Sequence, residues 1–176
     1  MQHLKGSNIY LRALEMSDLD FLYTLENNTD LWEISGTITP YSKQVLRLYL
    51  ENAYKDIYEV KQLRLCVCSA NDAVIGLIDL FDFDPKNKRA GLGIVILNEE
   101  ERNKGVGFDA VNVLCNYAFS TLGLHQIYAN VLEDNLASIH LFKKIGFKEI
   151  GVKKDWVLSG GSFKNEILFQ KINTCI

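Results

Sequence analysis

Arg102-Asn103-Lys104-Gly105-Val106-Gly107 joins a strand-like apolar stretch to a long segment of helical periodicity, and this junction decides the fold. Its two glycines allow a ligand to approach the backbone closely. The N–H groups of the first helical turn, with the positive end of the helix dipole, favour an anion. Arg102 and Lys104 add positive charge, so the junction predicts a cradle for a pyrophosphate.

Two other phosphate-binding motifs place glycines in similar positions. A P-loop requires Lys and then Ser or Thr next to its second glycine, whereas Phe108 follows Gly107 here. The relaxed dinucleotide fingerprint is met by Gly105, Gly107 and Ala110. However, a charged run at 98–104 separates the preceding strand from the first glycine, and the strands before it form a meander. The dinucleotide interpretation therefore stays an alternative to the pyrophosphate cradle.

Around this junction the chain alternates between helical and strand patterns. We expect strands at 9–11, 63–68, 74–83, 90–97, 127–132, 148–158 and 163–172, and helices at about 17–25, 42–58, 105–122 and 138–144. The stretch 27–41 reads as a loose connection. The order predicts an α/β (α+β) fold with a mixed, mostly antiparallel sheet of about seven strands and about four helices, in a single domain over 1–176.

Composition and charge exclude several classes of protein. Apolar residues make up 48% of the chain, and the net charge of −3 argues against a nucleic-acid partner. The cysteines and histidines lack the spacing of a zinc site, so no metal is expected. No N-terminal stretch reads as a signal peptide, and no apolar run approaches the ~20 residues that span a bilayer. We expect a cytoplasmic protein without a membrane partner.

A second segment, 135–147, reads Asn-Leu-Ala-Ser-Ile-His-Leu-Phe-Lys-Lys-Ile-Gly-Phe. A capped amphipathic helix that ends at glycine, with Ile139, Phe142 and Ile145 in the core, explains its periodicity. That account does not explain why the segment follows a glycine-rich basic turn, a helix and one strand.

Taken together, Arg102-x-x-Gly105-x-Gly107 and Asn135-x-x-Ser138-…-Phe142-x-x-x-Gly146-Phe147 resemble the two signature segments of the GNAT superfamily of acetyl-CoA-dependent N-acetyltransferases. The resemblance covers most of the chain. Within the superfamily the sequence is most similar to bacterial spermidine/spermine N-acetyltransferases and to ribosomal-protein N-terminal acetyltransferases. The resemblance implies a GNAT-like fold, acetyl-CoA as co-substrate, and direct attack by a primary amine without a covalent enzyme intermediate.

The resemblance also implies which residues hold acetyl-CoA. In the superfamily the strands that match 91–97 and 127–132 splay apart, and the pantetheine arm lies in the gap. By this analogy the backbone of the first strand faces the cofactor at Val95, Ile96 and Leu97. The pyrophosphate is expected on Arg102, Asn103, Lys104, Gly105, Val106, Gly107 and Phe108. Asn135 is expected to contact the pantetheine, and Ser138 and Phe142 to line its wall.

The amine must lose a proton, and the departing thiolate must gain one. Many relatives use a tyrosine at the position of Phe142 for the second transfer, and some carry a glutamate at Gly91, so this chain departs from the usual pair. Tyr128 and Ser138 are alternatives for the acid, although a core tyrosine and a helix cap explain them as well. The candidate bases are three carboxylates, each of which also fits an exposed surface position: Asp79, Asp82 and Glu33.

The sequence leaves the identity of the acetyl acceptor open. A negative cleft that includes Asp79, Asp82 and Asp84 favours a polyamine or another small amine. The alternatives are a ribosomal-type protein N terminus and a non-catalytic acetyl-CoA-binding module, the latter because of Gly91 and Phe142. Some relatives assemble into dimers or rings, so a homo-oligomer is a further expectation.

Overall fold

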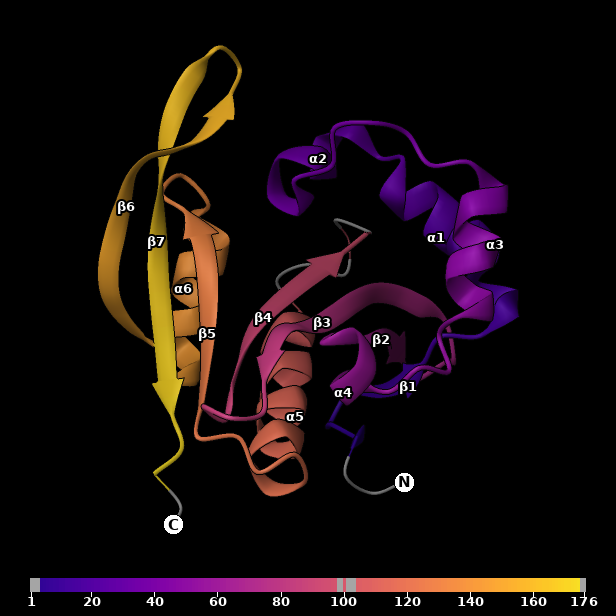
Figure 1. The fold of residues 1–176 in the computed structure, drawn as a ribbon, viewed down its shortest axis with the longest axis horizontal. Helices are drawn as coiled ribbons and strands as arrows, with labels where there is room; N and C mark the ends of the chain where they lie inside the picture. The colour runs from indigo at the N-terminus through magenta and orange to yellow at the C-terminus, as the bar shows by residue number, and fades with distance from the viewer. Residues whose placement is uncertain (1–3, 98–99, 101–103, 175–176) are drawn as a thin grey trace.

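A seven-stranded sheet runs through the molecule, and helices cover both of its faces (Figure 1). The computed structural model describes residues 4–97, 100 and 104–174. The strands lie in the order β1-β2-β3-β4-β5-β7-β6. Their bounds are β1 Ile9–Ala13, β2 Leu63–Ser69, β3 Val74–Asp84, β4 Arg89–Ile96, β5 Gln126–Leu132, β6 Lys148–Ser159 and β7 Ser162–Ile172. Only β4 and β5 pair in parallel among these strands, which confirms the mixed, mostly antiparallel sheet.

Six α-helices occur in the described part of the chain: α1 Leu19–Glu26, α2 Thr29–Ser35, α3 Lys43–Glu51, α4 Ile57–Val60, α5 Val106–Ser120 and α6 Leu136–Ile145. A short 3₁₀ turn, η2 Met16–Asp18, precedes α1. Ser42 caps α3 as the sequence predicts, because its hydroxyl accepts a hydrogen bond from the backbone N–H of Val45 at 3.2 Å.

Two of these helices differ from the sequence-based expectation. The predicted helix over 42–58 ends at Glu51, and α4 begins separately where the Asp56 carboxylate caps the next turn. The stretch expected as a loose connection contains α2, which Asn28 caps at its start and Gly36 ends in the left-handed region, with φ of 71°. Short helices of this kind depend on caps and packing more than on periodicity.

Each face of the sheet has its own hydrophobic core. The larger core joins the sheet to α5 and α6 and includes Leu92, Leu114 and Phe169. The smaller core lies under α1, α2 and α3, and both Cys66 and Cys68 are buried there as free thiols. The sheet therefore separates a helical layer built from α5 and α6 from a layer built by the N-terminal helices.

The sheet opens between its two central strands. β4 and β5 pair only at Arg89 with Gln126, Ala90 with Ile127, and Gly91 with Tyr128. Beyond Gly91 the two strands continue without pairing, as the resemblance implied for these segments. This separation positions the site described next.

Candidate active site

A pocket of about 840 Å³ lies beside the separated ends of β4 and β5. One wall comes from the end of β4, and a second comes from the first turns of α5 and α6. A third comes from α2 and the residue that caps it. The lining residues are Asn28, Asp30, Leu31, Ile34, Ile94, Val95, Ile96, Leu97, Gly105, Gly107, Phe108, Asn135, Ala137, Ser138, His140, Leu141 and Lys144.

Most of the predicted cofactor residues that the structure describes line this pocket. They come from three separate segments: Val95, Ile96 and Leu97; Gly105, Gly107 and Phe108; Asn135 and Ser138. Val106 and Phe142 are buried and do not line it, and Lys104 lies just before α5, outside the lining. Arg102 and Asn103 lie outside the described residues.

The start of α5 suits an anion. Gly105 caps the helix in the left-handed region with φ of 80°, and the space that a side chain would enter there is open for 4 Å. A Cβ at Gly107 would lie 3.4 Å from a terminal methyl carbon of Leu141, so this glycine permits close packing of α5 against α6. The Lys144 ammonium lies 5.0 Å from the centre of the Phe108 ring and adds positive charge beside the turn.

The start of α6 lies on the same pocket. The Asn135 side chain accepts a hydrogen bond from the Ser138 backbone N–H at 3.1 Å and so caps the helix. Phe142 points away from the pocket, since its ring packs against Phe147 at 5.1 Å and against Phe169 at 6.3 Å. Leu141 is the residue that lines the pocket instead.

Sequence reasoning missed the pocket residues of α2 and several of α6. On α6 the signal was available, because Ala137, Leu141 and Lys144 follow one another at spacings of four and three and therefore share a helical face. On α2 the signal was weak, since its stretch was expected as a loose connection.

Phe81 explains why position 91 carries no side chain. A Cβ added at Gly91 would lie 2.3 Å from the Phe81 ring. That ring also meets Tyr128 edge-on, with 5.9 Å between the ring centres. The space beside Gly91, where some relatives carry a glutamate, is therefore filled by an aromatic ring at the point where β4 and β5 part.

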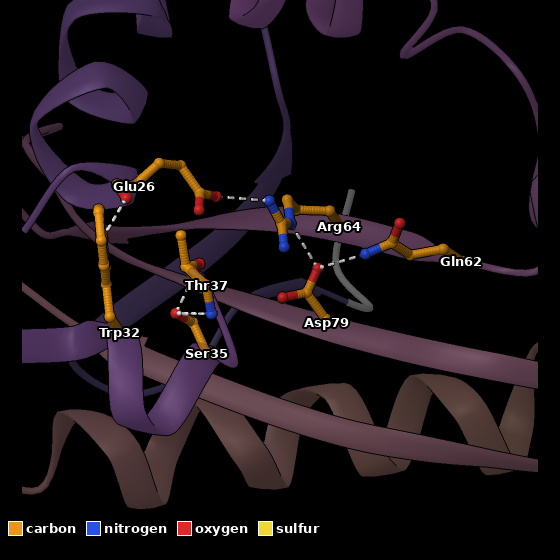
Figure 2. Close-up of polar contacts among 7 residues, drawn as sticks. All are labelled: Glu26, Trp32, Ser35, Thr37, Gln62, Arg64 and Asp79. Atoms are coloured by element: carbon orange, nitrogen blue, oxygen red, sulfur yellow. Dashed lines mark hydrogen bonds and ion pairs between the residues drawn. The ribbon is translucent and has the colours of Figure 1, made fainter. Parts of the chain in front are cut away.

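Asp79 forms an ion pair with the Arg64 guanidinium. Its carboxylate accepts hydrogen bonds from the Arg64 Nε at 2.7 Å and from the Gln62 amide at 3.3 Å, while Arg64 Nη1 reaches the Glu26 carboxylate at 2.8 Å (Figure 2). The guanidinium also lies 5.7 Å from the centre of the Tyr49 ring. These contacts occupy Asp79 and leave it poorly placed to accept a proton from an amine.

The other two candidate bases have different partners. Asp82 accepts a hydrogen bond from the Tyr128 hydroxyl at 3.3 Å, and it lies at an irregularity of β3 with φ of 49°. Burial, followed by the nearby Asp82 charge, raises the pKa of Tyr128 above its ordinary value. Glu33 forms an ion pair with Lys164 at 2.5 Å. Thus Asp82 is the candidate that lies at the parting of β4 and β5, beside Tyr128. Neither Asp82 nor Tyr128 is among the residues that line the pocket.

Two classes of feature are absent from the described residues. No group of three or more His, Cys, Asp or Glu side chains there is arranged to hold a metal ion. None of the described helices is both long and apolar enough to span a membrane.

Comparison with known proteins adds family evidence to this geometry. Residues 8–148 match the family model described as the acetyltransferase (GNAT) domain. Spermidine N(1)-acetyltransferase of Vibrio cholerae is 33% identical over 147 residues, which cover 83% of this chain and 82% of that protein. The crystal structure of the V. cholerae spermidine N-acetyltransferase in complex with CoA and spermine superimposes with a TM-score of 0.84 at 27% identity, over 95% of this chain and 96% of that one.

A second structure of the V. cholerae spermidine N-acetyltransferase, described as dodecameric and in an intermediate state, superimposes with a TM-score of 0.79 at 29% identity, over 95% of each chain. The sheet order, the parting of β4 and β5 and the glycine-rich start of α5 agree with the family match. The chain therefore belongs to the GNAT family of N-acetyltransferases, whose acetyl donor is acetyl-CoA.

Proposed function

We propose that the chain, as one domain over 1–176, transfers the acetyl group of acetyl-CoA to a primary amine of a polyamine. The observation that carries the proposal is the pocket where the separated β4 end meets the first turns of α5 and α6. The V. cholerae relative, named for spermidine and crystallised with CoA and spermine, supports a polyamine as the acceptor.

In this proposal the coenzyme follows the pocket walls. Its pyrophosphate lies against the N–H groups at the start of α5, where Gly105 leaves open space. Its pantetheine arm runs along the end of β4 at 95–97 and faces Asn135 and Ser138 across the pocket. A backbone N–H of β4 polarises the thioester carbonyl as the oxyanion develops. The amine and the thioester are thereby held together for direct attack.

We assign the proton transfers to Asp82 and Tyr128. The Asp82 carboxylate takes a proton from the ammonium, and the free amine attacks the thioester carbonyl. As the carbon–sulfur bond breaks, the Tyr128 hydroxyl gives its proton to the thiolate, and the amide nitrogen loses its remaining extra proton to water. The proton that Asp82 took from the ammonium then passes along the Tyr128–Asp82 hydrogen bond and restores the tyrosine. A tyrosine hydroxyl is protonated at neutral pH, as a proton donor requires, and burial raises the pKa of Tyr128 further.

Tyr128→Phe and Asp82→Asn test this assignment. Removing a general acid or base typically slows catalysis by about 10²-fold or more, so kcat should fall in both variants while the affinity for CoA is retained. Glu59→Gln, on the exposed part of α4, serves as the control. Full activity in Tyr128→Phe would exclude the tyrosine as the acid.

The acceptor is tested by acetyl-CoA-dependent thiol release with spermidine, spermine, a diamine, an aminoglycoside and a ribosomal-protein N-terminal peptide. Release with the polyamines alone is the expected result. Release with the peptide alone would replace the polyamine by a protein N terminus. CoA binding without release from any of these amines would count against a polyamine acetyltransferase and favour a binding module.

We further propose a homo-oligomer that uses the β6–β7 hairpin. β6 is an edge strand of the sheet, and the hairpin exposes large apolar side chains: Trp156 is 59% exposed, Leu158 63% and Phe163 61%. Exposed apolar groups gathered on a projecting edge are typical of protein–protein contacts. The dodecameric V. cholerae relative supports the same conclusion.

A further inference from the structure

Lys164, on β7, contacts two carboxylates that come from different walls of the pocket. Its ammonium lies 2.5 Å from the Glu33 carboxylate on α2 and 2.6 Å from the Asp134 carboxylate, which immediately precedes α6. Lys164, followed by the Ser159 side chain at the end of β6, lowers the pKa of Glu33 below its ordinary value. One lysine of the β6–β7 hairpin thus forms ion pairs with both α2 and the residues just before α6.

Both segments that Lys164 contacts form pocket walls. α2 contributes Leu31 and Ile34 on one side, and Ile34 directly follows Glu33 in the helix. Asp134 adjoins Asn135, which caps α6 and lines the opposite side. A single side chain therefore connects the α2 wall to the α6 wall.

The other attachments of α2 lie along its inner edge. Leu31 is buried in the smaller core, and the Trp32 indole N–H donates to the backbone carbonyl of Glu26 at 2.8 Å (Figure 2). Ile34 is 51% exposed, and Gly36 ends the helix. Glu33 lies two residues from Leu31 and so on roughly the opposite side of the helix, where its ion pair with Lys164 joins α2 to the β6–β7 hairpin.

We propose that Lys164 is a positioning residue that holds α2 closed over the pocket. We call the three residues Glu33, Lys164 and Asp134 the latch. The latch fixes the distance between the α2 wall and the α6 wall, and so the width of the opening through which an acceptor enters beside α2. The identity of the donor and acceptor in the pocket rests on the proposed function, whereas the closure of α2 by the latch does not.

The exposure of the three latch side chains sets how strongly their ion pairs can hold α2. The side chains of Lys164, Glu33 and Asp134 are 24%, 34% and 53% exposed, and isolated ion pairs of such exposure stabilise little. One ordered lysine serves two pairs here, so the entropy of fixing its side chain is lost only once. We expect removal of the latch to loosen α2 by about threefold to tenfold, without unfolding the protein.

Lys164→Met removes the charge and keeps the length of the side chain, and Glu33→Gln removes only the α2 arm of the latch. Hydrogen exchange of the backbone over 29–36 should quicken about threefold to tenfold in both variants and return to the original rate in Lys164→Arg. Lys153→Met is the matched control, because Lys153 lies on the same hairpin but pairs with Glu166 of the neighbouring strand. It should leave this exchange unchanged.

Steady-state kinetics give the second measurement. In Lys164→Met the KM for the amine should rise by about threefold to tenfold, as the exchange rate does. The kcat should change by less than about twofold, since the reacting groups stay in place. Unchanged exchange over 29–36, or equal quickening in Lys153→Met, would overturn the latch. Exchange is measured without donor or acceptor, so a failed polyamine assay would leave its result intact.

Discussion

At the residue scale, one pair of residues on neighbouring strands decides which side chain fits at the centre of the sheet. The sequence shows that a glycine stands at position 91. It does not show which residue fills the space beside that glycine, because Phe81 comes from the neighbouring strand. The register places Phe81 directly opposite Gly91, and the ring occupies the volume that any side chain at position 91 would need. The glycine and the phenylalanine are therefore complementary in size.

Gly91→Ala should lower the free energy of unfolding by about 1–3 kcal/mol, because its Cβ would lie 2.3 Å from the Phe81 ring. Urea denaturation measures the loss. In the double variant Phe81→Ala/Gly91→Ala the overlap is gone, so the two changes should cost less together than the sum of the single changes. Additive costs would show that the ring yields to the new methyl group without strain.

At the element scale, prediction succeeded where the pattern is long and failed where an element is short. The strands and the long helix α5 carry enough alternation or periodicity to be located from the sequence. Asn28, Gly36 and Asp56 act as local caps, and each defines a helix of only four or seven residues that no periodicity reveals.

The candidate site divides in the same way. Its cofactor walls follow local motifs, so most of the residues named from the sequence do meet at the pocket. The partners of the acidic candidates do not follow from any local pattern, since Lys164 lies 131 residues from Glu33 and Tyr128 lies 46 residues from Asp82. On α6 the periodicity places Phe142 in the core, where the structure has it, whereas the pocket wall expected of Phe142 from the resemblance is formed by its neighbour Leu141.

A buried ion pair joins β1 to η2 and gives a prediction at this scale. Asp18 is only 4% exposed and accepts hydrogen bonds from both Arg12 terminal nitrogens at 2.8 Å and from the Glu15 backbone at 2.8 Å. Burial alone would raise the pKa of Asp18, but the Arg12 and Glu15 hydrogen bonds lower it below its ordinary value. A lowered folded-state pKa contributes stability that is fully present above about pH 4 and lost as the pH falls through it.

Asp18→Asn should therefore destabilise the protein by about 2–3 kcal/mol at neutral pH, because it leaves the half-buried Arg12 without its counter-charge. The difference between the two proteins should shrink below about pH 4, where Asp18 of the unfolded wild-type chain binds a proton that folding must release. Denaturation midpoints measured from pH 7 to pH 3 test this. A difference that stays constant over this range would contradict an electrostatic origin.

At the scale of the whole molecule, the two cores and the β6–β7 hairpin have separate tasks. The cores hold the two helical layers against one sheet, whereas the hairpin extends beyond them (Figure 1). Its large apolar side chains, among them Trp156 and Phe163, are exposed. Exposed residues of this kind contribute little to folding, so changes there should affect assembly before stability.

Trp156→Ser and Phe163→Ser should shift the protein to a smaller species in light scattering at micromolar concentration. Their unfolding free energy should stay within about 0.5 kcal/mol of the wild type under dissociating conditions. Tyr54→Ser, at a residue that is 81% exposed on another surface, should leave the mass unchanged. A wild-type protein that is already monomeric would refute the hairpin interface.

The parting of β4 and β5 has a consequence for the lifetime of the protein. Only three residue pairs join β4 to β5 in the described structure, so the proposed coenzyme would stabilise a part of the sheet that the backbone leaves unpaired. A ligand that binds only the native state lowers the unfolded fraction by mass action, by about 2.7 kcal/mol at a hundred times its Kd. Chains without acetyl-CoA should then be the first that proteases remove, and the amount of enzyme would follow the supply of its own donor.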